Sequence, residues 1–318
     1  MIPFEWLEQA ERRIAPHIQR TPLTHDERRG LYLKWENRQV TGSFKPRGAL
    51  NKVLSLEDWE RQAGLVTVSA GNHGQGVALA GGLTGAAVEV FVSNHAVPAK
   101  VQAMQNLGAT VHFVEGGYAE AESAGRRYAA EQGRTLVSPY NDGQVIAGQA
   151  TIGLEILRDL RESAANWIVP SGGGGLISGL GASLRGVSPR PNLIGVQAAA
   201  SPFTHSLFHR HTQQGVQDNP TLADGLSGAV EEGSVTIPMM AECVDDFLLV
   251  SEQELERAMA FAWHVHHERI EGAGAAGLAA ALSGKVKERP SVVVISGGNV
   301  QPEVHEEIIA RYAGEQWD

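Results

Sequence analysis

Short apolar runs alternate with longer helical patterns through most of this 318-residue chain, and this alternation constrains its fold most strongly. We expect strands at residues 65–68, 87–92, 110–114, 135–137, 167–169, 193–196, 247–250 and 292–295. We expect helices between them at residues 74–82, 99–107, 119–131, 146–161 and 252–267. Several runs are apolar throughout, which is typical of parallel strands that are buried on both faces. The sequence therefore predicts an α/β protein with an open parallel sheet covered by helices.

The composition excludes several classes of protein. The net charge is −10 and the basic residues form no stripe, so nucleic acid is not an expected partner. The single cysteine, Cys243, allows no intramolecular disulfide and no thiolate metal cluster, which is consistent with a reducing cytoplasm. The N-terminus lacks a signal-peptide core, and no apolar run reaches the roughly 18 residues of a membrane span. We expect a soluble, cytoplasmic protein.

One lysine stands in an unusual sequence. Residues 42–49 read GSFKPRGA, so Lys45 is followed directly by Pro46. Proline is tolerated in the first turn of a helix but not in its interior, which places Lys45 at a helix start. There the helix dipole favours a neutral amine, the form that Schiff-base chemistry requires. The alternative is an ordinary solvated lysine.

Two loops that follow expected strands have the composition of anion-binding sites. Residues 69–76 read SAGNHGQG, and the side chains of Ser69, Asn72 and His73 lie beside a helix start that suits an anion or a phenolate-like oxygen. The alternative there is a simple helix cap. Residues 170–179 read PSGGGGLISG, and four consecutive glycines suit main-chain amides that crowd around a phosphate. A flexible linker fits poorly because strand and helix patterns flank this loop.

Three other features of the sequence are weaker signals. Ser296 follows the run 292–295 and can present a hydroxyl to a ring nitrogen, although the loop alone is only a turn signal. Three glycines, Gly272, Gly274 and Gly277, have dinucleotide-binding spacing, but a helical segment precedes them and close helix packing explains them better. Three histidines at 264, 266 and 267 lack carboxylates at ligand spacing, so a solvated or interfacial helix is favoured over a metal site.

From about Arg20 to Val300 the chain resembles the fold-type-II pyridoxal-phosphate enzymes, in the branch of threonine/serine dehydratases and serine racemase. The motifs that carry the resemblance lie at residues 42–49, 69–76, 145–156, 170–179, 221–226 and 295–299. The resemblance implies the two-domain, tryptophan synthase β-subunit-like fold, with pyridoxal 5'-phosphate in the cleft between the domains. It implies a large cofactor-binding domain (1–60 and 140–318), a small substrate-side domain (61–139) and a homodimer.

The resemblance also implies a role for each matching residue. Lys45 would hold the cofactor covalently and later act as the base at Cα. The phosphate would bind the backbone amides of Gly172, Gly173, Gly174, Gly175 and Leu176. The ring would be flanked by Phe44, with Asn72 on its hydroxyl and Ser296 at its nitrogen. The substrate carboxylate would bind Ser69, Asn72 and His73.

These roles favour one reaction. A hydroxyl at the ring nitrogen leaves the ring a weak electron sink, which favours prompt loss of a β-substituent. A β-hydroxy amino acid such as L-threonine or L-serine would then yield a 2-oxo acid and ammonia. Racemases of this branch have a serine where this chain has Ala70, which cannot transfer a proton. The cysteine synthase branch resembles SxKDR and SGNTG, unlike SFKPR and AGNHG here.

Several questions stay open at this point. Many relatives hold a divalent cation with an acidic pair, but here those positions are Gln197 and Phe203, so we expect no metal site. The chain ends at Asp318, without room for a regulatory domain, which favours a catabolic or general dehydratase. The alternatives are a dehydratase of 3-hydroxyaspartate or another hydroxy amino acid, an amino-acid racemase, and a non-catalytic cofactor- or amino-acid-binding protein.

Overall fold

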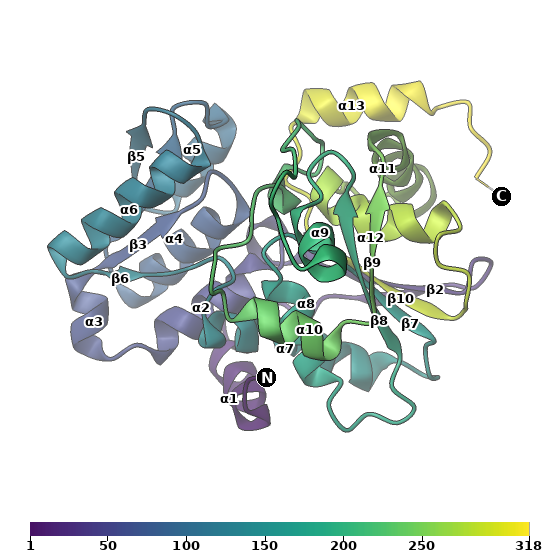
Figure 1. The fold of residues 1–318 in the computed structure, drawn as a ribbon, viewed down its shortest axis with the longest axis horizontal. Helices are drawn as coiled ribbons and strands as arrows, with labels where there is room; N and C mark the ends of the chain where they lie inside the picture. Colours follow the sequence, from purple (N-terminus) through teal and green to yellow (C-terminus); the bar gives the residue numbers. More distant parts are fainter. Residues whose placement is uncertain (318) are drawn as a thin grey trace. The chain divides into compact units, whose positions relative to one another are not determined.

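The computed structural model describes residues 1–317, which form two compact units (Figure 1). Unit 1 contains Met1, Gln19–Phe44 and the chain from Ile152 onward. Unit 2 contains Ile2–Ile18 and Lys45–Thr151. The junction at residues 44 and 45 falls immediately before the lysine that the sequence analysis singles out.

Unit 1 is built on a six-stranded sheet. The strands, in their order across the sheet, are β1 (Leu23–Asp26), β2 (Leu31–Trp35), β10 (Ser291–Ile295), β7 (Asn166–Pro170), β8 (Asn192–Ala198) and β9 (Asp246–Val250). All neighbouring strands are parallel except β1, which pairs antiparallel with β2. Every residue of β2, β7 and β10 is buried, as expected for central strands that are covered on both faces.

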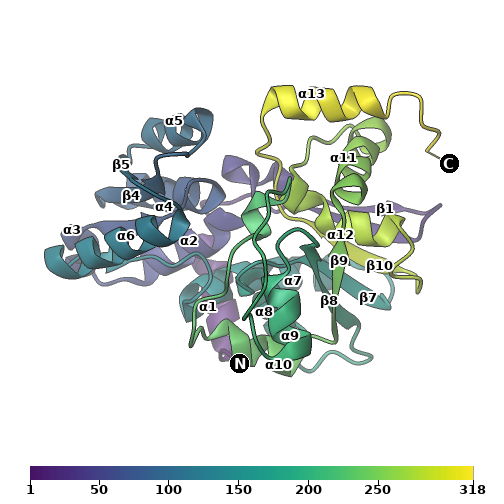
Figure 2. The same cartoon turned by 45° about the horizontal axis from the view of Figure 1, so that its top comes forward.

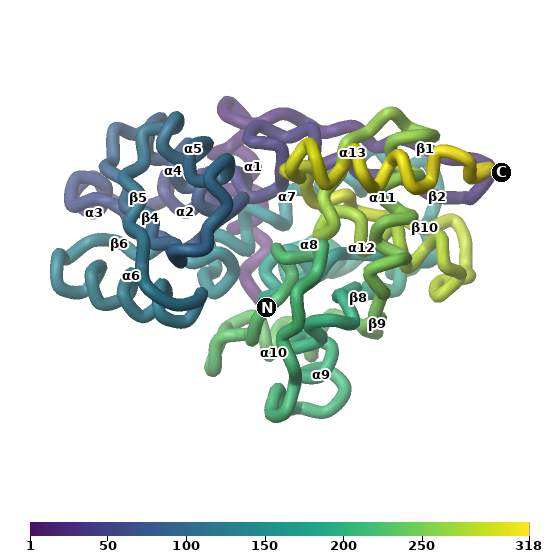
Figure 3. The backbone as a smooth tube through the Cα atoms, turned by 90° about the horizontal axis from the view of Figure 1, so that it is seen from above, coloured from purple at the N-terminus to yellow at the C-terminus, as the bar shows by residue number. Residues whose placement is uncertain are grey.

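Helices cover both faces of this sheet (Figures 1 and 3). On one face α12 (Gly272–Leu282) packs on the strands and α11 (Glu252–His266) packs on α12, while α13 (Pro302–Arg311) lies against α11. On the other face lie the second half of α7 (Gly143–Asp159), α8 (Gly175–Ser183) and α10 (Thr236–Cys243), whose apolar residues share a core with the strands. Helix α9 (Phe203–Arg210) packs along β8 and β9.

Unit 2 contains a smaller, fully parallel sheet (Figure 2). Its strands, in order, are β5 (Thr110–Val114), β4 (Val88–Ser93), β3 (Leu65–Val68) and β6 (Thr135–Leu136). Helix α6 (Tyr118–Gln132) covers one face. The other face carries α2 (Lys45–Ser55), α4 (Asn72–Thr84) and α5 (Pro98–Asn106), while α1 (Phe4–Ile14) packs on α2 and α3 (Asp58–Ala63) lies beside β6.

The structure confirms the expected α/β class and contains all eight expected strands. The sequence analysis did not predict β1 and β2. Strand β1 is polar and half-exposed, and β2 carries Lys34 among its apolar residues, so neither run has a clear strand pattern. The glycines of residues 272–277 lie in α12, where a Cβ on Gly272 or Gly274 would approach a backbone oxygen within 2.3 Å. Close packing therefore explains these glycines, as predicted.

The two units do not follow the expected domain boundaries, since the breaks after residues 60 and 139 both lie inside unit 2. Helix α2 belongs to unit 2 because Ala49, Leu50 and Val53 share a core with the four-stranded sheet. The first part of α7 also belongs to unit 2, because its backbone contacts the backbone of α2: a Cβ on Gly148 would lie 2.3 Å from the Arg47 oxygen. The division into a cofactor-binding and a substrate-side domain stays a prediction.

Within residues 1–317, no helix is both long enough and apolar enough to cross a membrane.

Candidate active site

Lys45 is the first residue of α2, as the following proline predicted. Its Nζ lies 3.4 Å from the carbonyl oxygen of Pro139, which precedes α7. Helix α4 packs directly on the start of α2: a Cβ on Gly76 would lie 3.2 Å from the carbonyl carbon of Lys45. Within unit 2, Lys45 and the loop that begins α4 are therefore neighbours.

His73 is buried and electrically neutral. Burial, together with the nearby charge of Lys45, lowers the pKa of His73 to about 3, although the hydrogen bond with Val137 acts in the opposite direction. A neutral ring has one N–H, which Nε2 donates to the Val137 oxygen at 3.0 Å. The other nitrogen, Nδ1, is buried without a hydrogen-bond partner among residues 1–317. The ring therefore cannot act as a cation towards a carboxylate, and the anion-binding group of His73 is its backbone amide.

The loop before α4 presents backbone amides to one side. Ser69 Oγ accepts a hydrogen bond from the Gly71 amide at 3.2 Å, and Gly71 is the N-cap residue, with no side-chain cap on the helix. The first-turn amides of an α-helix have no acceptor inside the helix. In α4 these include the amides of Asn72 and His73, so this helix start can bind an anion.

In unit 1 the glycine loop, residues 171–175, connects β7 to α8. A Cβ on Gly172 would lie 3.0 Å from the Leu226 Cα, and a Cβ on Gly174 would lie 2.6 Å from the Met240 sulfur. Gly174 also has a φ of +86°, in the left-handed region, so a side chain here is excluded on two grounds. Positions 172 and 174 therefore require glycine. The loop continues into the first turn of α8, whose backbone amides can bind an anion.

A phosphate group fits this loop. The hydroxyls of Ser171, directly before the glycines, and Ser178, in the first turn of α8, are buried and have no hydrogen-bond partner among residues 1–317. Buried hydroxyls normally have a partner, so these two indicate an acceptor that the protein itself does not supply. The backbone amides and these hydroxyls together are the donors that a phosphate requires.

Ser296 lies near the glycine loop within unit 1. It follows β10, and β10 pairs in parallel with β7, so both strands end at the same edge of the sheet. Ligands bind at this edge in open α/β sheets.

The segment that precedes Lys45 is tied to the loop that carries Ser296. The Phe44 amide donates to the Ser296 oxygen at 3.0 Å, and Ser43 forms a β-bridge with Gly297. The side-chain amide of Asn299 donates to the Thr41 oxygen at 2.7 Å. Thr41 has a φ of +63°, a conformation that β-branched residues rarely adopt. Thr41 and Asn299 are not among the site residues expected from the sequence, because a positive φ at threonine leaves no sequence signal.

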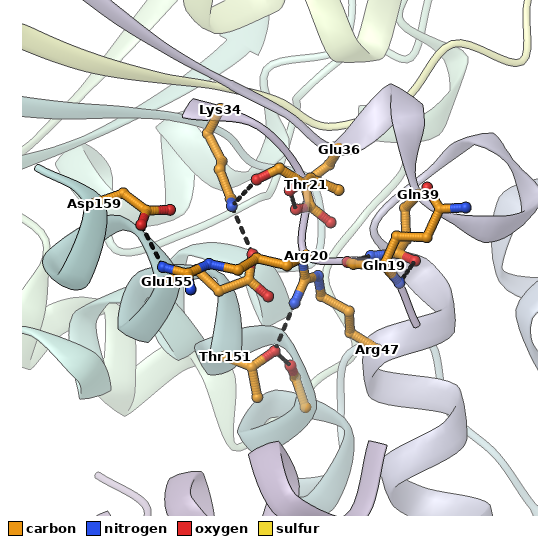
Figure 4. Close-up of polar contacts among 11 residues, drawn as sticks. Gln19, Arg20, Thr21, Lys34, Glu36, Gln39, Arg47, Thr151, Glu155 and Asp159 are labelled. Atoms are coloured by element: carbon orange, nitrogen blue, oxygen red, sulfur yellow. Dashed lines mark hydrogen bonds and ion pairs between the residues drawn. The ribbon is translucent and has the colours of Figure 1, made fainter. Parts of the chain in front are cut away.

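A second lysine, Lys34 on β2, is more deeply buried than Lys45 and forms an ion pair with a carboxylate (Figure 4). Its Nζ lies 2.6 Å from Glu155 Oε2 and 2.7 Å from the Thr21 oxygen. A buried ammonium that is paired with a carboxylate stays charged, so Lys34 is no candidate for a Schiff base. Glu155 belongs to the motif at residues 145–156, and this ion pair gives the motif a structural role that the sequence analysis missed.

Gln197 and Phe203, the two positions considered for a cation in the sequence, make contacts within the protein. The Gln197 side chain accepts a hydrogen bond from the His205 amide at 3.1 Å and donates one to the Leu226 oxygen at 3.0 Å. Phe203 is the buried first residue of α9. No group of three or more His, Cys, Asp or Glu side chains in the described chain could hold a metal ion. Of the three histidines near the end of α11, His264 bonds to the Ile309 oxygen at 3.3 Å.

The site residues thus form two sets. Lys45, Ser69, Asn72 and His73 belong to unit 2. Phe44, the five residues from Gly172 to Leu176, and Ser296 belong to unit 1.

The chain is similar to known proteins over most of its length. A family model described as "Pyridoxal-phosphate dependent enzyme" matches residues 14–297. L-threonine ammonia-lyase from Thermotoga maritima is 39% identical over 316 residues, which cover 97% of this chain and 78% of that protein. The catabolic L-threonine dehydratase TdcB from Staphylococcus aureus is 40% identical over 306 residues, which cover 92% of this chain and 88% of that protein.

Solved structures give a similar result. The crystal structure of a threonine deaminase from T.th. has a TM-score of 0.85 and 33% identity, and the match covers 93% of this chain and 98% of that chain. Maize serine racemase has a TM-score of 0.89 and 29% identity, and the match covers 98% of each chain.

Proposed function

The chain belongs to the family of pyridoxal-phosphate-dependent enzymes, and from this premise we propose that it converts L-threonine, L-serine or both to a 2-oxo acid and ammonia. It is a carbon–oxygen lyase of the threonine ammonia-lyase type, the activity after which its relatives are named. The observation that carries the proposal is the position of Lys45. It begins α2, beside the anion-binding loop of α4, and directly follows a segment that is bonded to the Ser296 loop.

We propose that five elements of the chain hold the cofactor. Lys45 attaches it covalently, and the amides from Gly172 to Leu176 bind its phosphate. The Asn72 side chain would bond to the ring hydroxyl, Phe44 would flank the ring, and the Ser296 hydroxyl would face the ring nitrogen. Pyridoxal phosphate, when bound, supplies an electron sink for the electrons of the Cα–H bond. The glycine cradle and the buried hydroxyls of Ser171 and Ser178 support this assignment.

The same residues account for the proton transfers. Ser69 and the amides of Asn72 and His73 hold the substrate carboxylate, which orients the Cα–H bond. The Lys45 amine takes this proton, and its place at the positive end of the α2 dipole favours the neutral form that accepts a proton. Lys45 would return this proton to the β-hydroxyl, which leaves as water, and a second water would hydrolyse the resulting enamine to the 2-oxo acid and ammonia. His73 takes no part as an acid, because its ring stays neutral above a pH of about 3.

A substrate panel tests the proposal. Purified protein with added cofactor is assayed for 2-oxo acid release from the L- and D-isomers of serine, threonine and 3-hydroxyaspartate. We expect release from L-threonine or L-serine and none from their D-isomers. Release from 3-hydroxyaspartate alone would favour that substrate instead. If a protein that holds the cofactor on Lys45 releases nothing from any of them, the lyase proposal is wrong.

Racemisation is the second candidate, because maize serine racemase shares the fold over the whole chain. A racemase needs a proton donor on the second face of Cα, and here the position before Gly71 is Ala70. We therefore expect little racemisation. Chiral chromatography of L-serine after prolonged incubation measures it, and D-serine formed as fast as the 2-oxo acid would contradict the assignment.

We also propose that the enzyme works in the cytoplasm as a homodimer. The single cysteine supports a reducing compartment: Cys243 is largely buried, and burial raises the pKa of its thiol to about 12. The dimer rests on the family resemblance, and light scattering of the eluted protein tests it directly.

A further inference from the structure

Two buried threonines bond to the carbonyl groups of the glycine loop. Thr204 Oγ1, on α9, donates to the Gly172 oxygen. Thr236 Oγ1, on α10, donates to the Gly173 oxygen at 2.8 Å. Both threonines are fully buried. Two helices that are distant in the sequence therefore fix the orientation of two successive peptide groups in this loop.

The orientation of the carbonyls determines where the amides point. In a trans peptide the C=O group and the following N–H group point in opposite directions. The amides of Gly173 and Gly174 therefore point away from Thr204 and Thr236. The first-turn amides of α8, from Gly175 onward, have no acceptor inside the helix. If a threonine hydroxyl is removed, its carbonyl loses its partner, and the peptide group is free to rotate and take its amide out of position.

Other buried groups hold the two threonines in place. Ser234 Oγ lies 2.8 Å from Thr236 Oγ1. On the other side, Gln197 bonds to the His205 amide in the first turn of α9 and to the Leu226 oxygen. The Leu226 backbone is what a Cβ on Gly172 would meet. Gln197 thus links α9 to the backbone that lies behind the loop.

We propose that Thr204 and Thr236, braced by Ser234 and Gln197, are positioning residues that set the amides of the glycine loop for the cofactor phosphate. The inference rests on the proposed function, since it takes this loop as the phosphate site. Its consequence is a specificity: these hydroxyls contribute to the preference of the protein for pyridoxal phosphate over pyridoxal, which has no phosphate. Hydroxyls that only satisfied buried carbonyls would stabilise the fold without affecting this preference.

The test compares the affinities for the two compounds. Apoprotein of T204V and T236V is titrated with pyridoxal 5'-phosphate and with pyridoxal, and absorbance gives both dissociation constants. We expect each variant to bind pyridoxal phosphate about five- to tenfold more weakly, the effect of losing one hydrogen bond. Pyridoxal binding should change less than about twofold, because pyridoxal does not use the loop. The phosphorus NMR signal of the bound cofactor should shift in the same variants.

Conservative variants and matched controls distinguish a positioning role of the two threonine hydroxyls from a role in packing alone. T204S and T236S keep the hydroxyl and should restore the wild-type preference. S206A removes a buried hydroxyl on α9 that bonds to the Thr212 oxygen, and S183A removes one on α8 that bonds to the Leu180 oxygen. Neither hydroxyl touches the loop, so both variants should keep the wild-type preference.

The possible results are distinct. Equal weakening of both compounds in T204V and T236V, or no weakening of either, would overturn the inference. Pyridoxal binding also reports that a variant is folded, and if a valine variant binds neither compound, the alanine variants, which place no methyl group against the carbonyl, replace it. A wild-type protein without any preference for the phosphate would refute the phosphate site itself, and with it part of the proposed function. If the wild-type protein prefers pyridoxal phosphate to pyridoxal and both variants keep this preference, only the role of the threonines is refuted.

Discussion

The loop between β7 and α8 and the loop between β3 and α4 both lead from a buried parallel strand into a helix N-terminus, yet they offer different chemistry. The glycine loop has four residues without side chains, and hydroxyls from two other helices bond to its carbonyls. The second loop carries Ser69, Asn72 and His73. Its hydrogen bonds include a local one from the Gly71 amide to Ser69 Oγ, and others to distant segments: the Ser69 amide bonds to the Phe91 oxygen, and the His73 ring bonds to the Val137 oxygen.

This difference matches the two parts of the proposed ligand. A phosphate is the same in every turnover, and backbone amides in a rigid loop bind it without the entropic cost of ordering side chains. A substrate must also be oriented for reaction, and Ser69 with the amides of Asn72 and His73 would fix its carboxylate and so the direction of its Cα–H bond. The following experiments test this division of roles, from the largest expected effect to the smallest.

Replacement of Lys45 should have the largest effect. In Lys45→Ala we expect 2-oxo acid release to fall on the order of 10³-fold, because the proton acceptor and the covalent attachment are both lost. Borohydride treatment should fix no cofactor to this variant. The matched control is Lys52→Ala on the same helix, which loses only an ion pair with Asp142 at 2.8 Å. Turnover that persists in Lys45→Ala would refute the mechanism for both loops.

Replacement of Gly174 should damage the glycine loop alone. Gly174→Ala forces a side chain into the left-handed region, at roughly 1–2 kcal/mol, and pushes it against Met240. We expect at least about tenfold weaker binding of pyridoxal phosphate, measured by absorbance titration. In Gly215→Ala the φ is +76° but no atom lies within 4 Å, so this control should lose stability and keep its cofactor affinity. Equal cofactor affinity in both variants would contradict the assignment of the loop.

Replacement of His73 should alter the pH dependence of stability. The pKa of His73 is about 3 in the folded protein and about 6.5 when unfolded, so between these values only the unfolded state binds the proton. The wild-type free energy of unfolding should therefore fall as the pH is lowered from 6.5 towards 3, with about 1.4 kcal/mol per pH unit from this residue. His73→Gln keeps a donor for Val137 and should lack this contribution.

Urea unfolding at several pH values measures the slope for His73→Gln. His17→Gln, a half-buried position in unit 2, serves as the control. An unchanged slope in His73→Gln would show that the ring is not neutral and buried as described.

Removal of metal ions should have the smallest effect. The side-chain nitrogen of Gln197 bonds to the Leu226 oxygen and its side-chain oxygen bonds to the His205 amide. A divalent cation is therefore not needed to hold α9 beside Leu226. We expect that EDTA leaves the rate of 2-oxo acid release and the cofactor affinity unchanged within about twofold. A loss of activity that magnesium or calcium restores would contradict this expectation and reveal a site with other ligands.

Local patterns in the sequence predicted much of the fold, and they alone gave the residues of the proposed site. The eight expected strands are largely apolar runs, so they could be found, and Pro46 placed the start of α2 at Lys45. Strand β2 could not be found, because Lys34 interrupts its apolar pattern and pairs with Glu155, 121 residues away. The limits of the two units were not expected from the sequence either. Helix α2 and the first part of α7 belong to unit 2 because they pack on each other, and this packing has no local pattern.

The sequence by itself determined which groups are proposed to carry the chemistry: a lysine at one helix start, a run of glycines at another, and Ser69, Asn72 and His73 at a third. Only the tertiary structure decided how these groups are held. Thr236 bonds to a glycine that lies 63 residues away, and the neutral state of His73 depends on burial by residues from several segments. Hydrogen bonds between distant segments leave no periodic pattern in a sequence, because any threonine can form them once folding brings a carbonyl within reach.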